Sequence, residues 1–274
     1  MSLRTDLVSE NNEFENNTGV LESKFGECTV FELNIKNEKT AKLFNKPKGK
    51  YFTIKFKSFL SLNNTSDLEK ALIYTLENLM SENVRQETLI VGLGNSDITP
   101  DALGPLTVDK IFATRHIEKE LRDRLNLGGL KSVCALIPGV IGKTGIEAAE
   151  TVGAAVKSIN PGAVIVIDAL AACDAENLCC TIQLTDSGIN PGSGVNNSRK
   201  ELSFNTLGVP VVAIGIPTVI DSASIIKEGE KDINMMVTPK EIDMLIEKAA
   251  EFLSNTLNTF LQPNIEPEIL AAIT

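Results

Sequence analysis

Two aspartates stand where an α/β protein would place catalytic carboxylates. Asp101 follows the glycine-rich turn after the apolar run 88–93, and Asp168 comes directly after the apolar run 163–167. Ligands of open α/β sheets bind outside the carboxyl ends of the strands, which is where both residues would lie. Two carboxylates meeting there can divide acid–base work, one activating water while the other protonates the leaving amide. The pair therefore predicts a hydrolytic site.

Each aspartate also has a purely structural interpretation. Aspartate is a favoured helix N-cap, and Asp101 precedes a predicted helix. Asp168 could instead accept hydrogen bonds from loop amides, since structural networks also perturb carboxylates. Taken singly, each residue is explained as well by structure as by catalysis. Burial at the rim of the core would raise the pKa of Asp168 and favour a proton-holding role.

Other catalytic chemistries have weaker support in the sequence. A Ser–His–Asp or Cys–His arrangement would have to use His116, the single histidine, which falls within a predicted helix. The stretch 142–144 ends like a phosphate-binding loop, but the first glycine of that motif would fall at Ile137. The five cysteines show no CxxC spacing and are expected to be free thiols. We expect no metal and no cofactor.

A long polar loop is the candidate for substrate binding. Residues 187–200 read SGINPGSGVNNSRK, and such loops are either functional lids or mobile surface segments. Backbone amides of this loop, with Ser193, Asn196 and Arg199, could hold a peptide over the site. A mobile surface loop is the equal alternative.

The elements that must position these residues alternate between strands and helices. Continuous runs of Val, Ile and Leu are typical of strands covered on both faces. Such runs lie at 88–93, 133–137, 163–167 and 209–216. Helices are predicted at 67–82, at 101–125 with a break near Gly104, at 144–159 and from 238 onward. This alternation predicts a mostly parallel, doubly wound sheet flanked by helices.

The N-terminal part is predicted to add antiparallel strands to this sheet. Residues 28–35 and 51–56 have β character, so 26–60 is expected as an antiparallel addition. The first 25 residues are rich in Asn and Glu and are expected to be flexible. With 274 residues, the chain can bury a sizeable core, and 1–274 is expected to form a single α/β domain.

Composition argues against several partners. The net charge of −10 disfavours nucleic acid, and no Trp with two Tyr leaves little for base stacking. No apolar run approaches the roughly 18–20 residues of a membrane span, and the N-terminus lacks the apolar core of a signal peptide. We therefore expect a cytoplasmic protein without nucleic-acid or membrane partners.

Several long segments together resemble the germination protease family of spore-forming bacteria. They are VGLGNSDITPDALGP (91–105), IPGVIGKTGIEAAE (137–150), VIDALAA (166–172), TIQLTDSGINPGSGV (181–195), TLGVPVVAIGIPTVID (206–221) and VTPKEID (237–243), with minor contributions from RTDL (4–7) and KGKY (48–51). The resemblance covers nearly the whole chain.

The resemblance implies an endopeptidase of the spore core that degrades small acid-soluble spore proteins during germination. The family is an atypical group of aspartic peptidases, and its fold is similar to that of hydrogenase maturation proteases. Its catalytic aspartates lie in TPDALGP and IDALA, which here contain Asp101 and Asp168. The resemblance also implies a homotetramer and a zymogen with a short N-terminal propeptide.

Three departures from the family pattern keep alternatives open. The RTDL motif begins at residue 4, so a propeptide is expected to be absent or already removed. Cys173 and Asp174 stand where the family usually has a basic residue, and residues 260–263 replace a segment that often carries His. One alternative is a non-enzymatic or regulatory paralogue that binds spore proteins. Another is a metal-dependent peptidase in which Asp101 and Asp168 hold a divalent cation.

Overall fold

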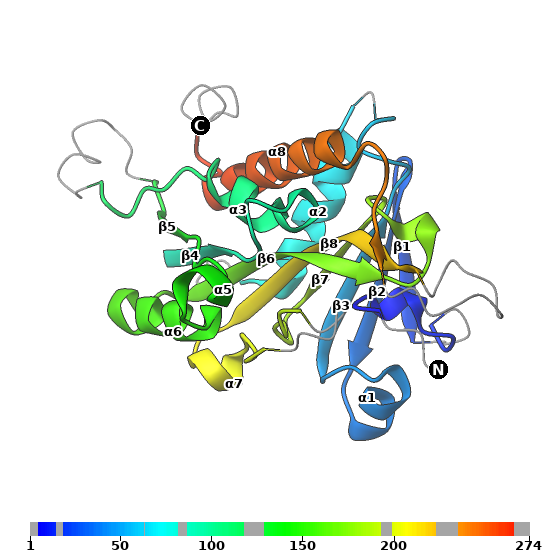
Figure 1. Ribbon diagram of the computed structural model, residues 1–274, viewed down its shortest axis with the longest axis horizontal. Helices are drawn as coiled ribbons and strands as arrows, with labels where there is room; N and C mark the ends of the chain where they lie inside the picture. The colour runs from blue at the N-terminus through cyan, green and yellow to red at the C-terminus, as the bar shows by residue number, and fades with distance from the viewer. Residues whose placement is uncertain are drawn as a thin grey trace.

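A mixed sheet with helices on both faces forms the protein (Figure 1). The computed structural model describes residues 5–14, 19–62, 64–81, 87–117, 129–192, 199–222 and 235–265. Within these residues the sheet has nine strands in the order β1-β2-β3-β7-β8-β6-β4-β5, and the short β9 pairs with β8. The predicted α/β class is confirmed.

Four parallel strands make up one half of the sheet. They are β4 (Glu87–Gly92), β5 (Ser132–Leu136), β6 (Ala163–Ala172) and β8 (Val211–Asp221). All four coincide with the predicted apolar runs, although β6 and β8 continue further. After β4 the chain forms β5 on one side and then β6 on the other, so the winding direction reverses at β4. Ligand sites of doubly wound sheets lie at the carboxyl end of such a switch point.

The other half of the sheet is antiparallel. Its strands are β1 (Val20–Phe25), β2 (Cys28–Ile35), β3 (Gly49–Lys55), β7 (Thr181–Thr185) and β9 (Met236–Val237). The predicted strands at 28–35 and 51–56 are confirmed. β7 lies outside the predicted strands; it joins the N-terminal strands to β8 and has all five residues buried.

Helices pack on the two faces of the sheet over separate cores. The first face carries α2 (Ser66–Leu79), α3 (Leu103–Val108) and α8 (Ile242–Leu261), and the second carries α5 (Ile141–Thr144), α6 (Ala148–Ile159) and α7 (Phe204–Leu207). Successive strand residues point to opposite faces. In β4, Ile90 belongs to the first core, while Leu89 and Val91 belong to the second. Shorter helical segments are η1 (Val8–Glu10), α1 (Glu38–Phe44), η3 (Thr99–Asp101) and η4 (Ala175–Asn177).

The predicted helix at 101–125 is wrong over most of its described length. Within residues 101–117, η3 and α3 are the helical segments, and α3 ends at Val108. Beyond it, the Asn258 side chain of α8 accepts from the Phe112 amide at 2.9 Å and donates to the Lys110 carbonyl at 3.0 Å. The Thr114 amide donates to the Val133 carbonyl at 2.8 Å. These tertiary bonds replace the helical ones, so His116 lies outside any helix.

The first 25 residues, which are expected to be flexible, make defined contacts in the part that the structure describes. Leu7 and Val8 are 0% and 1% exposed, and Phe14 is 5% exposed. Residues 20–25 form β1 against β2. Asparagine and glutamate dominate the composition of this stretch, but the buried Leu7, Val8 and Phe14 anchor it.

Candidate functional site

Asp101 is held at the end of β4 by a tight turn. The Asn95 amide donates to the Asp101 carboxylate at 2.9 Å and to its carbonyl at 3.1 Å. Gly94, with φ of +114°, allows this turn, since a Cβ there would lie 1.9 Å from the Asp101 carbonyl oxygen. From β8, the Thr218 hydroxyl donates to the Pro100 carbonyl at 2.7 Å. The glycine-rich sequence after β4 thus fixes the carboxylate rather than leaving it on a loose loop.

Asp168 lies in β6 at the point where its neighbour β4 has ended. The last register pair is Gly92 with Ile167, and the Leu93 amide donates to the Ile167 carbonyl at 2.8 Å. On its other side Asp168 pairs with Gly215 of β8, where a Cβ would lie 2.5 Å from the Leu170 side chain. Asp168 is 6% exposed. The aspartate therefore stands inside a longer strand than predicted, yet at the carboxyl edge of β4.

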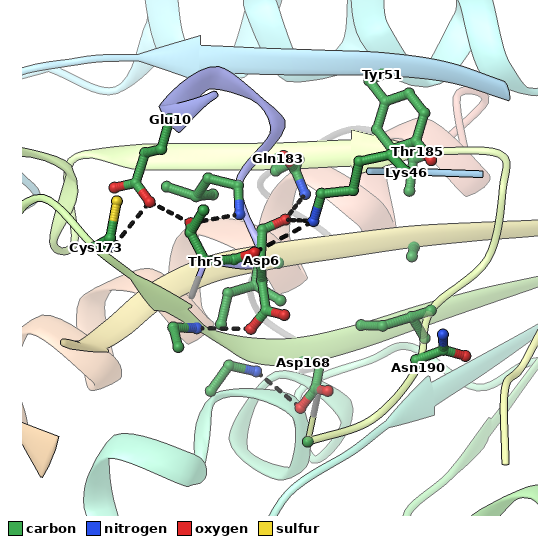
Figure 2. Close-up of a pocket in the computed structure, with 18 of the residues that line it drawn as sticks. Thr5, Asp6, Glu10, Lys46, Tyr51, Asp168, Cys173, Gln183, Thr185 and Asn190 are labelled. Atoms are coloured by element: carbon green, nitrogen blue, oxygen red, sulfur yellow. Dashed lines mark hydrogen bonds between the residues drawn. The ribbon is translucent and has the colours of Figure 1, made fainter. Parts of the chain in front are cut away.

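Close backbone packing brings the two aspartates to one cavity. A Cβ on Gly104 of α3 would lie 2.2 Å from the Leu93 carbonyl oxygen and 2.6 Å from that of Ile167. Because Gly104 has no side chain at this contact, α3 and η3 can approach the end of β4 and the middle of β6. Asp101 and Asp168 both line a cavity of about 1290 Å³, part of which Figure 2 shows.

The surroundings of the two carboxyls raise the pKa of both, and that of Asp168 more strongly. Burial raises the pKa of Asp168 well above its usual value, and the negative charges of Asp101 and Asp6 raise it further. The Ala169 amide, which donates to Asp168 at 2.9 Å, and Arg199 oppose that increase. Burial also raises the pKa of Asp101, against the Asn95 amide and Arg199. The negative charge of Asp101 raises the pKa of Asp168, which is the more buried group. Asp168 is therefore the carboxyl that keeps a proton to higher pH.

The polar loop is near the site at its two described ends. Arg199 acts electrostatically on both aspartates, and its amide donates to the Pro191 carbonyl at 3.2 Å. Gly188 and Asn190, at the other end, line the cavity. Ser193 and Asn196 lie outside the described residues. Of the three predicted substrate-binding residues, the structure therefore describes only Arg199.

The N-terminal segment forms a wall of the cavity, although none of its residues was a predicted site residue. The Asp6 carbonyl accepts from Lys46 Nζ at 2.7 Å and from Gln183 Nε2 at 2.9 Å (Figure 2). The Val8 amide donates to Gln183 Oε1 at 2.6 Å. All three polar side chains, those of Asp6, Lys46 and Gln183, line the cavity. The single signal in the sequence was the RTDL segment at 4–7, where no chemistry was assigned.

The described part of the chain shows neither an activated thiol nor a cluster of metal ligands. All five cysteines are free. Burial, followed by the charge of Glu10, raises the pKa of Cys173 to about 12, and burial raises the pKa of Cys179 to about 12. Neither residue would be a thiolate near neutral pH. Among the described residues, no group of three or more His, Cys, Asp or Glu side chains could hold a metal ion.

The helices that the structure describes include none that is long and apolar enough to cross a membrane.

Comparison with known proteins gives one consistent family. The profile described as "Germination protease" matches residues 3–233. The germination protease of Clostridium tetani is 37% identical over 98% of both chains, and that of Priestia megaterium is 32% identical over 100% of this chain and 97% of its own. A hydrogenase maturation protease, HycI of Thermococcus kodakarensis, aligns with a TM-score of 0.37 and 18% identity, covering 67% of this chain and 98% of its own.

Proposed function

The chain belongs to the germination protease family and is therefore a peptidase, and from this premise we propose that it is an aspartic endopeptidase using Asp101 and Asp168. One observation carries the proposal. Two carboxyls, one in η3 after β4 and one within the neighbouring parallel strand β6, line a single cavity, and their surroundings favour a proton on Asp168. A carboxyl pair that shares a proton can activate water and protonate a leaving group without forming a covalent intermediate.

The proposed mechanism assigns different work to the two groups. Asp101, the less buried, accepts a proton from water as the water oxygen attacks the peptide carbonyl carbon. Asp168 donates its proton to the amide nitrogen as the carbon–nitrogen bond breaks. The reaction ends with the proton on Asp101 rather than Asp168, so exchange with solvent restores the starting state. The two groups titrate as a coupled pair, and the roles can be exchanged between them.

Small acid-soluble spore proteins are the proposed substrates, in the spore core during germination. Membership of the family supports this choice, as does a cavity of about 1290 Å³ that is large enough for several residues of an extended chain. Arg199 is proposed to contact the substrate from the polar loop. A homotetramer made as a zymogen is the assembly that we propose on the same family grounds.

Incubation with a purified small acid-soluble spore protein tests the proposed activity. We expect a few defined fragments, identified by mass spectrometry, with the same fragments when a strong chelator is present. An unrelated, equally unfolded protein serves as the control for specificity. Binding without cleavage would instead support a regulatory paralogue, and loss of cleavage with chelator would support a metal-dependent peptidase.

A further inference from the structure

We propose that Asp6 is a positioning residue whose carboxylate, held at the end of β6, keeps the proton of the aspartate pair on Asp168. This inference rests on the proposed function and adds a third carboxyl to it. In Figure 2 the Asp6 side chain extends from the N-terminal segment toward Asp168. Both residues line the same cavity.

Asp6 is fixed through both its backbone and its side chain. Its amide donates to the Ala171 carbonyl at 2.9 Å, and its Oδ2 accepts from the Ala171 amide at 2.9 Å. Its carbonyl accepts from Lys46 and Gln183 at 2.7 and 2.9 Å. One bond thus holds the carboxylate itself, and three hold the backbone that carries it. The anchoring specifies where the negative charge of Asp6 lies relative to Asp168.

Charges from three elements act on Asp168, and Asp6 supplies one of them. Asp101 at the end of η3 and Asp6 in the N-terminal segment are acidic, whereas Arg199 in the polar loop is basic. Burial lowers the pKa of Lys46, and the charges of Asp6 and Glu10 oppose that decrease. Both acids oppose ionisation of Asp168, and Arg199 favours it. Asp6 therefore counteracts Arg199, which also acts on Asp101 and favours its ionised form.

The consequence can be tested through the pH dependence of activity. Asp168 must hold a proton to donate it, so activity is lost as pH rises through its pKa. Removing the Asp6 charge lowers that pKa and moves the loss to lower pH. Asp6→Asn is the appropriate change, because the amide oxygen can still accept from Ala171. We expect activity on the alkaline side of the profile to fall roughly threefold or more, with the plateau at lower pH retained.

Two matched variants separate charge from structure. Asp6→Glu keeps the charge and should keep the alkaline side of the profile near that of the parent protein. Glu10→Gln removes a charge from the same segment, where Glu10 accepts from the Cys173 and Asp174 amides at 2.8 and 3.0 Å. Glu10 is not among the charges that act on Asp168. Its removal should leave the position of the alkaline limb unchanged.

A readout that does not need proteolysis completes the test. The carbon-13 signal of the Asp168 side-chain carboxyl, identified by its disappearance in Asp168→Asn, can be titrated by NMR. We expect its midpoint at lower pH in Asp6→Asn, and this result would uphold the role of Asp6 even if the parent cleaved nothing. An unchanged midpoint would overturn the inference while leaving the peptidase proposal intact. Loss of activity at every pH in folded Asp6→Asn would also overturn it, since Asp6 would then be a reacting group.

Discussion

Replacing Asp168 by asparagine should stabilise the fold at alkaline pH while removing its proposed chemistry. The carboxyl is 6% exposed, and burial together with two acidic neighbours raises its pKa well above the usual value. The folded state therefore binds this proton more tightly than the unfolded state does. Below the pKa that Asp168 has in the unfolded state, its ionisation does not affect the free energy of unfolding. That free energy falls as pH rises from the unfolded-state pKa to the folded-state pKa, and above the folded-state pKa the loss is complete. An asparagine side chain never ionises and escapes that cost.

The size of the effect follows from linkage. Each unit by which folding raises the pKa corresponds to about 1.4 kcal/mol. Because the pKa of Asp168 is raised well above its usual value, we expect Asp168→Asn to gain at least about 1 kcal/mol at pH 8. Asparagine can still accept from the Ala169 amide, which now bonds Asp168 at 2.9 Å. Near pH 3 the parent is protonated, so the gain should disappear.

Urea unfolding at pH 3.5, 6 and 8 would measure this gain, provided that the dependence on urea is the same for both proteins. Asp97→Asn is a suitable control, since Asp97 pairs with Lys143 on the surface with 68% of its side chain exposed. Surface pairs contribute only about 0–1 kcal/mol. A variant less stable than the parent at pH 8, or a difference that does not vary with pH, would refute the reasoning.

Two further changes test how the site is built. Gly104→Ala should destabilise the fold by about 1–3 kcal/mol and reduce activity, because its Cβ would lie 2.2 Å from the Leu93 carbonyl oxygen. Gly142→Ala is the control in the same unfolding and cleavage assays. A Cβ there would have nothing within 4 Å, so we expect neither effect. Arg199→Ala should move the whole pH profile of activity upward, since the pKa values of both aspartates lose the same opposing charge. Lys200 pairs with Glu150 at 2.9 Å, so Lys200→Ala should leave the pH profile in place. An equal shift in both variants would contradict the electrostatic effect of Arg199 on the two aspartates.

The parallel part of the fold could be predicted because its signal is local. A strand covered on both faces must be apolar at nearly every position, and the runs that became β4, β5, β6 and β8 have that composition. Their carboxyl ends meet at one edge of the sheet. That rule predicts Asp101 and Asp168 as candidates, and the structure adds that both line one cavity.

The errors arose where distant contacts decide the local structure. The sequence after α3 has helical character, but hydrogen bonds with Asn258 of α8 fix it in another conformation. Such a bond joins residues about 146 positions apart and leaves no periodic trace in either segment. Propensity is a weak prior when tertiary bonds of this kind compete with it.

The N-terminal wall of the site was missed for a similar reason. Asp6 is bonded to Ala171 and Gln183, which lie 165 and 177 residues further along the chain. The composition of the first 25 residues predicts only a polar, flexible segment. Only the topology of the sheet, which places β7 and the end of β6 beside the segment, gives it a defined position.

The central claim is that Asp101 and Asp168 act as one unit, and a cycle of single and double variants tests it most directly. Cleavage of a small acid-soluble spore protein would be measured for the parent, Asp101→Asn, Asp168→Asn and the double variant, with folding confirmed by circular dichroism. Residues that act together are strongly non-additive, so we expect each single change to lower kcat/KM by at least about 10³ and the double change to lower it little further. A folded single variant that keeps more than about a tenth of the parent activity would contradict the account.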